Sequence, residues 1–223
     1  MKATTSTKPQ DYDKGVYKTI PYYDDIHKNI LDLIGVLPKA PSRWLDTGCG
    51  TGVLIQRALP LWPEADFVLA DPNPDMLSLA RKKFGEGSQF TYILSGSEDI
   101  LVEENEYDVI TAVLSHHYLN QQQRAAATEK YFIALKPGGI FVTCEHMAPR
   151  TEEGRQLLLS RWEKYQISAG KTPEKAASHI ARYGIGYYPI TLQDHLDLLS
   201  SVGFSTVEVL WISYIDVVLY AVK

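Results

Sequence analysis

Short apolar runs alternate with amphipathic stretches through the first two thirds of the chain. The apolar runs predict strands over residues 44–46, 67–70, 90–94, 107–113 and 138–144. The amphipathic stretches between them predict helices over 51–58, 74–84 and 121–135. Strands that alternate with helices in this way build a parallel sheet with helices on both faces, so we expect an α/β fold.

The N-terminal part begins without a periodic pattern. Residues 1–20 are expected to be loosely ordered, and Tyr12 and Tyr17 within them are candidates to fold over a ligand. The spacing of apolar residues then predicts an amphipathic helix over 24–37. We expect residues 1–40 to form a cap on the domain.

The last third of the chain departs from the strand–helix alternation. Polar helical stretches over 151–167 and 172–183 have no strand between them, which predicts a helical lid inserted over 147–190. A helix over 191–202 follows. The final apolar runs, 205–211 and 214–222, are separated by two residues and predict an antiparallel hairpin. We therefore expect one domain over residues 1–223.

A glycine-rich turn follows the first predicted strand, in the order Asp46-Thr47-Gly48-Cys49-Gly50-Thr51-Gly52. Glycines leave the backbone bare for a ligand, and the helix that follows adds partial positive charge. Asp46 would repel a phosphate at this turn, but it would attract a cationic amino group. S-adenosylmethionine (SAM) has an ammonium and a sulfonium and no phosphate, so the turn favours SAM over a dinucleotide.

This segment resembles the first motif of the class I SAM-dependent methyltransferases, D/E-x-G-x-G-x-G. The resemblance implies a Rossmann-like, mostly parallel seven-stranded sheet that ends in an antiparallel hairpin. It implies SAM as cofactor and S-adenosylhomocysteine (SAH) as product. NAD-binding Rossmann domains normally lack such a terminal hairpin, so we expect methyl transfer rather than hydride transfer.

The resemblance also suggests which residues bind SAM. Asp71, at the end of the second predicted strand, can accept both ribose hydroxyls. Gly96 stands where many family members have an aspartate, which leaves Ser97 and Glu98 to contact the adenine. The full set of expected cofactor residues is Tyr23, Asp46, Gly48, Cys49, Gly50, Asp71, Pro72, Met76, Ser97, Glu98, Val113 and Leu114.

Three residues are candidates for a general base: His117 after the fourth predicted strand, and Glu145 and His146 after the fifth. Most acceleration is nevertheless expected from alignment in a dry site, because the sulfonium is already a good leaving group. The adjacent histidines His116 and His117 have no third ligand at suitable spacing, and neither do Cys49 and Cys144. We therefore expect no metal.

Composition and charge limit the classes of partner and acceptor that we expect. The net charge of −5 argues against nucleic acid as the main partner. No apolar run is long enough to span a membrane, and the polar start is not a signal peptide, so we expect a cytoplasmic monomer or homodimer. Many of the fourteen tyrosines fall in segments expected to cover the pocket, including Tyr183, Tyr187 and Tyr188. Such rings suit a small-molecule acceptor, methylated at oxygen, nitrogen or carbon.

Three alternatives stay open, of which a nucleotide-dependent oxidoreductase is disfavoured by Asp46, by Val53 and by the terminal hairpin. The layout around Pro21-Tyr22-Tyr23 and the position of Arg182 are similar to the carboxy-SAM synthases of tRNA modification, in which an arginine meets the extra carboxylate. The ordinary glycine turn departs from theirs. The other alternative is a non-catalytic regulator that binds SAM, because no residue is an unmistakable catalytic group.

Overall fold

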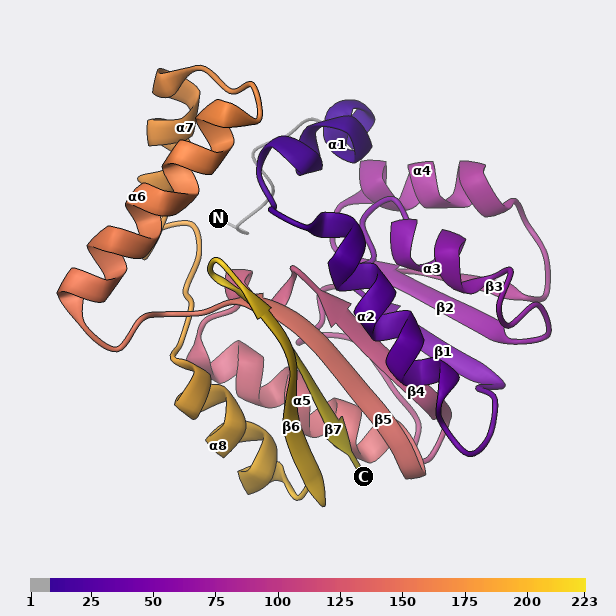
Figure 1. Ribbon diagram of the computed structural model, residues 1–223. Helices are drawn as coiled ribbons and strands as arrows, with labels where there is room; N and C mark the ends of the chain where they lie inside the picture. The colour runs from indigo at the N-terminus through magenta and orange to yellow at the C-terminus, as the bar shows by residue number, and fades with distance from the viewer. Residues whose placement is uncertain (1–8) are drawn as a thin grey trace.

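Seven strands form one sheet in the computed structural model, which describes residues 9–223. The strand order is β3-β2-β1-β4-β5-β7-β6 (Figure 1). The strands are β1 (Arg43–Thr47), β2 (Asp66–Asp71), β3 (Phe90–Leu94), β4 (Tyr107–Val113), β5 (Leu135–His146), β6 (Thr206–Ser213) and β7 (Asp216–Val222). The first five run parallel, and β7 pairs antiparallel with both β5 and β6. The predicted fold class is confirmed.

Two hydrophobic cores lie on opposite faces of the sheet. Alternate side chains of β1 divide between them, with Trp44 on one face and Leu45 on the other. The Trp44 face is covered by α2 (Tyr23–Gly35), α3 (Val53–Ala58) and α4 (Pro74–Phe84). The Leu45 face is covered by α5 (Gln121–Ala134) and α8 (Leu192–Val202). Both faces are thus buried, which explains why the central strands are apolar throughout.

Several element boundaries differ from the prediction. The hairpin turns at Tyr214 and Ile215 rather than at 212–213, because Ser213 pairs with Asp216 and Tyr214 takes a left-handed φ of 53°. Strand β5 begins at Leu135, which pairs with Tyr107, and a register shift then absorbs the Pro-Gly-Gly segment that follows. The predicted helix over 172–183 ends at Ile180, since Tyr183 bridges to Tyr187.

The prediction that residues 1–20 are loosely ordered is wrong for their described part. Helices α1 (Pro9–Gly15) and η1 (Val16–Lys18) form there, stabilised by tertiary contacts that local sequence does not reveal. We call Tyr12–Ile20 the N-terminal arm. Residues 1–8 lie outside the described part of the chain.

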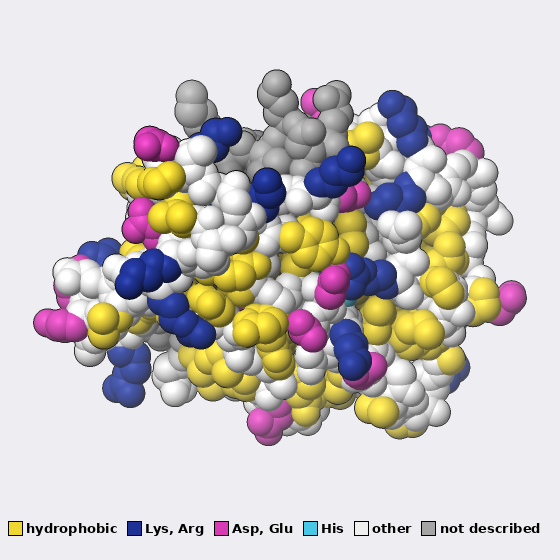
Figure 2. All heavy atoms as spheres, turned by 45° about the horizontal axis from the view of Figure 1, so that its top comes forward, with side chains coloured by type: hydrophobic (Ala, Val, Ile, Leu, Met, Phe, Trp, Pro, Cys, Tyr) yellow, Lys and Arg dark blue, Asp and Glu magenta, His cyan; other side chains and the backbone are white. Residues whose placement is uncertain are grey.

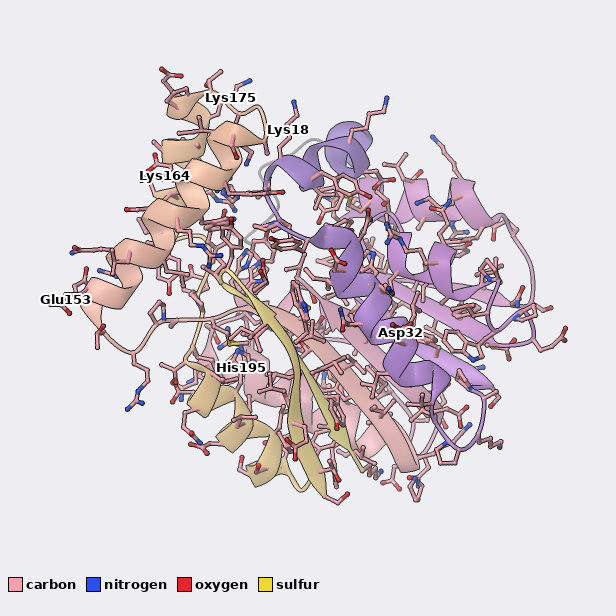
Figure 3. The ribbon with its side chains drawn as sticks, in the orientation of Figure 1. Lys18, Asp32, Glu153, Lys164, Lys175 and His195 are labelled. Carbon is pink, nitrogen blue, oxygen red and sulfur yellow. The ribbon has the colours of Figure 1, made fainter. Side chains whose placement is uncertain are left out.

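The arm lies between the glycine turn and two further helices, α6 (Glu152–Ser168) and α7 (Pro173–Ile180) (Figure 1). Thr51 Oγ1 donates to Asp13 Oδ1 at 2.5 Å, and Lys83 Nζ lies 3.6 Å from Asp13 Oδ2. On the other side, Trp162 Nε1 donates to the Thr19 carbonyl at 2.7 Å. Figure 3 shows Lys18 of the arm facing the α6–α7 pair. The arm therefore connects the cofactor end of the sheet to the predicted lid.

Candidate active site

Three neighbouring cavities lie beyond the carboxyl ends of the central strands, where ligands bind in doubly wound sheets. The main cavity has a volume of about 620 Å³. A pocket of about 30 Å³ contains Asp46, and we call it the Asp46 pocket. A pocket of about 40 Å³ contains His117, His146 and His179, and we call it the histidine pocket. Tyr12 and Leu114 line all three cavities, so the three cavities adjoin one another.

The glycine turn separates the main cavity from the Asp46 pocket. Gly48 and Gly50 both have left-handed backbones, with φ of 63° and 55°. A Cβ on Gly48 would lie 2.4 Å from Ser115 Cβ, whereas a Cβ on Gly50 would meet nothing within 4 Å and would enter the site. The first glycine therefore allows close packing with the loop after β4, and the second leaves room for a ligand.

Asp46 lies at the end of a buried hydrogen-bond chain. Trp44 Nε1 donates to Thr111 Oγ1 at 2.9 Å, and Thr111 Oγ1 donates to Asp46 Oδ1 at 2.7 Å. Burial raises the pKa of Asp46 from 3.8 to about 7, although the bond from Thr111 opposes the shift. Tyr23 and Cys49 line the same pocket. A cationic ligand group would restore the charge of this carboxyl.

Asp71 orders the opposite side of the turn. Its Oδ2 accepts from Gly50 N and its Oδ1 from Asn73 N, both at 2.8 Å. Burial raises the pKa of Asp71, and the two backbone donors oppose this shift. Each carboxylate oxygen keeps a second lone pair, so Asp71 can accept from a ligand as well.

The remaining predicted cofactor residues gather around the same space. Pro72, Met76, Ser97, Glu98, Val113 and Leu114 all line the main cavity. Glu98 Oε1 accepts from Gln123 Nε2 at 2.8 Å, which connects the loop after β3 to α5. Leu114 takes a left-handed φ of 55° and hydrogen-bonds through its N–H to the Cys144 carbonyl, which turns its side chain into the site.

The three candidate bases are separated from the main cavity and have different surroundings. Glu145 is 0% exposed and lines none of the three cavities. Its Oε1 accepts from His116 N and Thr143 Oγ1, and its Oε2 accepts from His117 N at 2.6 Å. Glu145 therefore holds the loop after β4 in position.

His117 and His146 form the floor of the histidine pocket, with their rings stacked at 4.1 Å. Burial lowers the pKa of His117 well below its usual value. His146 Nδ1 lies 2.6 Å from Asp216 Oδ1, and both side chains are buried.

Sequence reasoning missed several residues that the fold brings to the site. His27 lines the Asp46 pocket, and burial lowers its pKa to about 3. His179 of α7 lines the histidine pocket, and Asp216 of β7 contacts His146, which lines it. No local motif marks these residues, because only tertiary packing places them there. Among the tyrosines, Tyr187 lines the histidine pocket and Tyr188 the main cavity, while Tyr183 lies in an outer groove.

Within residues 9–223, no three or more His, Cys, Asp or Glu side chains converge as metal ligands. No helix in that part of the chain is long and apolar enough to cross a membrane. On the face shown in Figure 2, basic and acidic side chains are interspersed.

Comparison with known proteins agrees with this geometry. The profile of the methyltransferase domain family matches residues 45–139. The carboxy-S-adenosyl-L-methionine synthase of Citrifermentans bemidjiense is 24% identical over 202 residues, which cover 88% of this chain and 82% of that protein. The malonyl-[acyl-carrier protein] O-methyltransferase 1 of Ilyobacter polytropus is 27% identical over 118 residues, or 52% of this chain and 43% of that protein.

Among solved structures, the plantazolicin methyltransferase BpumL in complex with SAH has the same fold, with a TM-score of 0.69 and 14% identity. The match covers 96% of this chain and 88% of that one. The glycine turn with its preceding acid, the seven-stranded sheet and the domain profile over residues 45–139 all make the chain similar to the class I SAM-dependent methyltransferases.

Proposed function

We propose that this protein transfers the methyl group of SAM to an oxygen, nitrogen or carbon atom of a small molecule. The observation that carries the proposal is the division of the site at the glycine turn. The buried carboxyl of Asp46 faces one small pocket, and Asp71 borders the large cavity on the other side. This division matches the two ends of SAM, which are a cationic amino acid and a neutral nucleoside.

Each part of the site has a separate task in this proposal. Asp46 holds the ammonium group, and its own charge is restored by doing so. Asp71 accepts the ribose hydroxyls, while Met76 and the loop of Ser97 and Glu98 border the adenine. SAM supplies an activated methyl group when it is bound. Leu114 and Tyr12 then exclude water from the space where the acceptor meets that group.

The tyrosines that line the site favour a small acceptor over a macromolecule. Tyr12 from the arm and Tyr118 from the loop after β4 line both the main cavity and the histidine pocket. The interspersed charges in Figure 2 form no continuous basic surface on that face. Cytoplasmic location and a monomeric or dimeric state remain predictions.

A carboxy-SAM synthase is the second candidate, and Arg182 favours it. Its guanidinium carbon lies 4.7 Å from the centre of the Tyr187 ring, at the edge of the histidine pocket. Its positive charge contributes to the lowered pKa of both His117 and His179. A cation beside the acceptor space would suit a carboxylate, and two relatives with the carboxy-SAM synthase name are 24% identical to this chain over 202 aligned residues.

Calorimetric titration with SAM, SAH, carboxy-SAM and NADH tests the donor site. We expect SAM and SAH to bind and NADH not to bind. Asp71→Ala removes charged hydrogen bonds worth roughly 1.5–3 kcal/mol each, so it should weaken SAM binding by at least about 100-fold. The matched control is Asp66→Ala at the other, exposed end of β2, which should leave SAM affinity unchanged.

The outcomes separate the candidates. A clear preference for carboxy-SAM, lost in Arg182→Ala, would replace methyl transfer by the second candidate. Binding of SAM without release of SAH across a broad acceptor panel would point to a regulator. Failure of both SAM and carboxy-SAM to bind would contradict both enzymatic functions.

A further inference from the structure

The buried pair His146–Asp216 has no assigned task in the cofactor site. Asp216 begins β7 and lies directly opposite His146 in the antiparallel pairing with β5. His146 Nδ1 and Asp216 Oδ1 are 2.6 Å apart, and the two side chains are 4% and 0% exposed. Because one ring nitrogen of His146 is held by the carboxyl, the other ring nitrogen, Nε2, is left for the histidine pocket that the residue lines.

We propose that His146 is the general base of this enzyme, that Asp216 is the residue that orients it, and that the acceptor presents a hydroxyl group to the histidine pocket. The proposal rests on the methyltransferase function proposed above. It also selects one general base among the three candidates. The atom that accepts the methyl group is then oxygen, rather than oxygen, nitrogen or carbon.

The other two candidates lack the required geometry. All three donors to Glu145 come from the protein itself, and the carboxyl borders none of the cavities. His117 Nδ1 lies 3.2 Å from Glu145 Oε2 but has no hydrogen-bond partner there, so nothing fixes its tautomer. Of the three candidates, His146 alone combines an oriented ring with a place in the pocket wall.

The pocket wall keeps the His146 ring in place. His117 stacks on one side at 4.1 Å, and Trp162 meets the ring edge-on at 5.0 Å. The titratable and charged groups around His146 are Asp216 from β7, His117 from the loop after β4, His179 from α7, its chain neighbour Glu145, and Tyr187 with Arg182 over its ring. Burial lowers the pKa of His117 well below its usual value and that of His179 to about 3, so these two rings stay neutral and do not add positive charge near His146.

A hydroxyl acceptor fits both the size and the chemistry. A volume of about 40 Å³ admits a hydroxyl and its attached carbon, and the rest of the molecule would extend into the main cavity past Tyr118. An amine can attack as a neutral group and lose its proton afterwards. A hydroxyl that attacks with its proton in place becomes a strongly acidic oxonium, so an aligned base helps it most.

The proposed step balances atoms and charge. His146 Nε2 takes the hydroxyl proton while the acceptor oxygen bonds to the methyl carbon, and the electron pair of the broken carbon–sulfur bond stays on sulfur. The positive charge therefore moves from the sulfonium to the imidazolium of His146. Asp216, buried 2.6 Å away, stabilises that charge.

The tautomer of His146 tests the orientation directly. We would record long-range ¹H–¹⁵N spectra of the SAH-bound protein, and assign His146 by the signal lost in His146→Gln. The expected result is a proton on Nδ1 and none on Nε2. Asp216→Asn, which keeps the shape of the side chain, should shift the proton to Nε2, and Asp197→Asn on the exposed face of α8 should change nothing. A proton on Nε2 in the wild type would overturn the proposal.

Turnover with simple probes tests the chemistry. With SAM and phenol, we expect SAH release to fall by about 100-fold or more in both His146→Gln and Asp216→Asn, with little change in KM for SAM. The plot of rate against pH should lose its acidic limb in His146→Gln. Faster methylation of aniline than of phenol, unaffected by either substitution, would overturn the hydroxyl assignment. Calorimetry with SAM on each variant separates this failure from a failure of the methyltransferase function itself.

Discussion

At the residue scale, Asp46 should make SAM binding depend on pH. Burial raises the pKa of Asp46 to about 7, so the free site is largely protonated in mildly acidic solution. The ammonium of SAM favours the ionised carboxylate, and binding must then release a proton. We expect SAM affinity to rise by about tenfold per pH unit between roughly pH 5.5 and the pKa, and then to level off.

Calorimetry in buffers of different ionisation enthalpy would count the released proton. Asp46→Asn should bind SAM weakly and without this pH dependence, and a dependence that persists in that variant would assign it to another group. The stability of the ligand-free protein depends on pH in the opposite sense to the affinity for SAM. Because the folded pKa of Asp46 lies above the value of 3.8 in the unfolded chain, the ligand-free fold loses stability as the pH rises from about 4 to about 7.

Residues that act through a local motif could be found from the sequence, and residues that act through packing could not. The glycine turn and Asp71 are set by a strand, a turn and a helix that are adjacent in the chain. Asp216 faces His146 only because β7 returns antiparallel beside β5, 70 residues later. His179 comes from a helix whose position no strand pattern encodes.

At the scale of elements, the turn between β1 and α3 allows stability and binding to be changed separately. Gly48→Ala and Gly50→Ala both place a side chain at a left-handed φ, which costs about 1–2 kcal/mol in each case. Gly48→Ala adds a contact of 2.4 Å with Ser115 Cβ, while the new methyl group of Gly50→Ala points into open space in the site. We expect Gly48→Ala to lower the melting temperature clearly more, and Gly50→Ala to weaken SAM binding at a modest cost in stability.

Thermal unfolding and SAM titration of the two variants would check this pair. Equal losses of stability would show that the loop after β4 moves aside to make room for the methyl group. Gly138→Ala is the control, because it also has a positive φ and open space but lies far from the site. It should lose stability like Gly50→Ala and keep its affinity for SAM.

Most element types and their order followed from the sequence, whereas the element ends and helix α1 depended on contacts between distant segments. The hairpin turn lies two residues later than predicted because β6 contains a register shift between Val209 and Trp211, which periodicity does not reveal. Helix α1 was missed because it packs against α4, which is distant in the sequence, so its own residues do not reveal the contact.

At the scale of the whole molecule, the N-terminal arm should control the release of SAH. Asp13 connects the arm to Thr51 in the glycine turn and to Lys83 in α4. Asp13→Ala removes both contacts, worth about 1 kcal/mol together, and should speed SAH release about fivefold. Asp25→Ala on the exposed face of α2 is the matched control. Release would be followed by competition with excess SAM, and an unchanged rate in Asp13→Ala would show that the arm does not gate the site.

One side chain of the arm has a wider consequence. Tyr12 lines the main cavity, the Asp46 pocket and the histidine pocket alike, so a movement of this ring alters all three together. The affinity of the protein for SAM and its affinity for the acceptor are therefore thermodynamically coupled. An acceptor that holds Tyr12 in its closed position must tighten SAM by the same factor by which SAM tightens the acceptor. Cooperativity between two substrates that bind in separate cavities can thus arise from a single tyrosine.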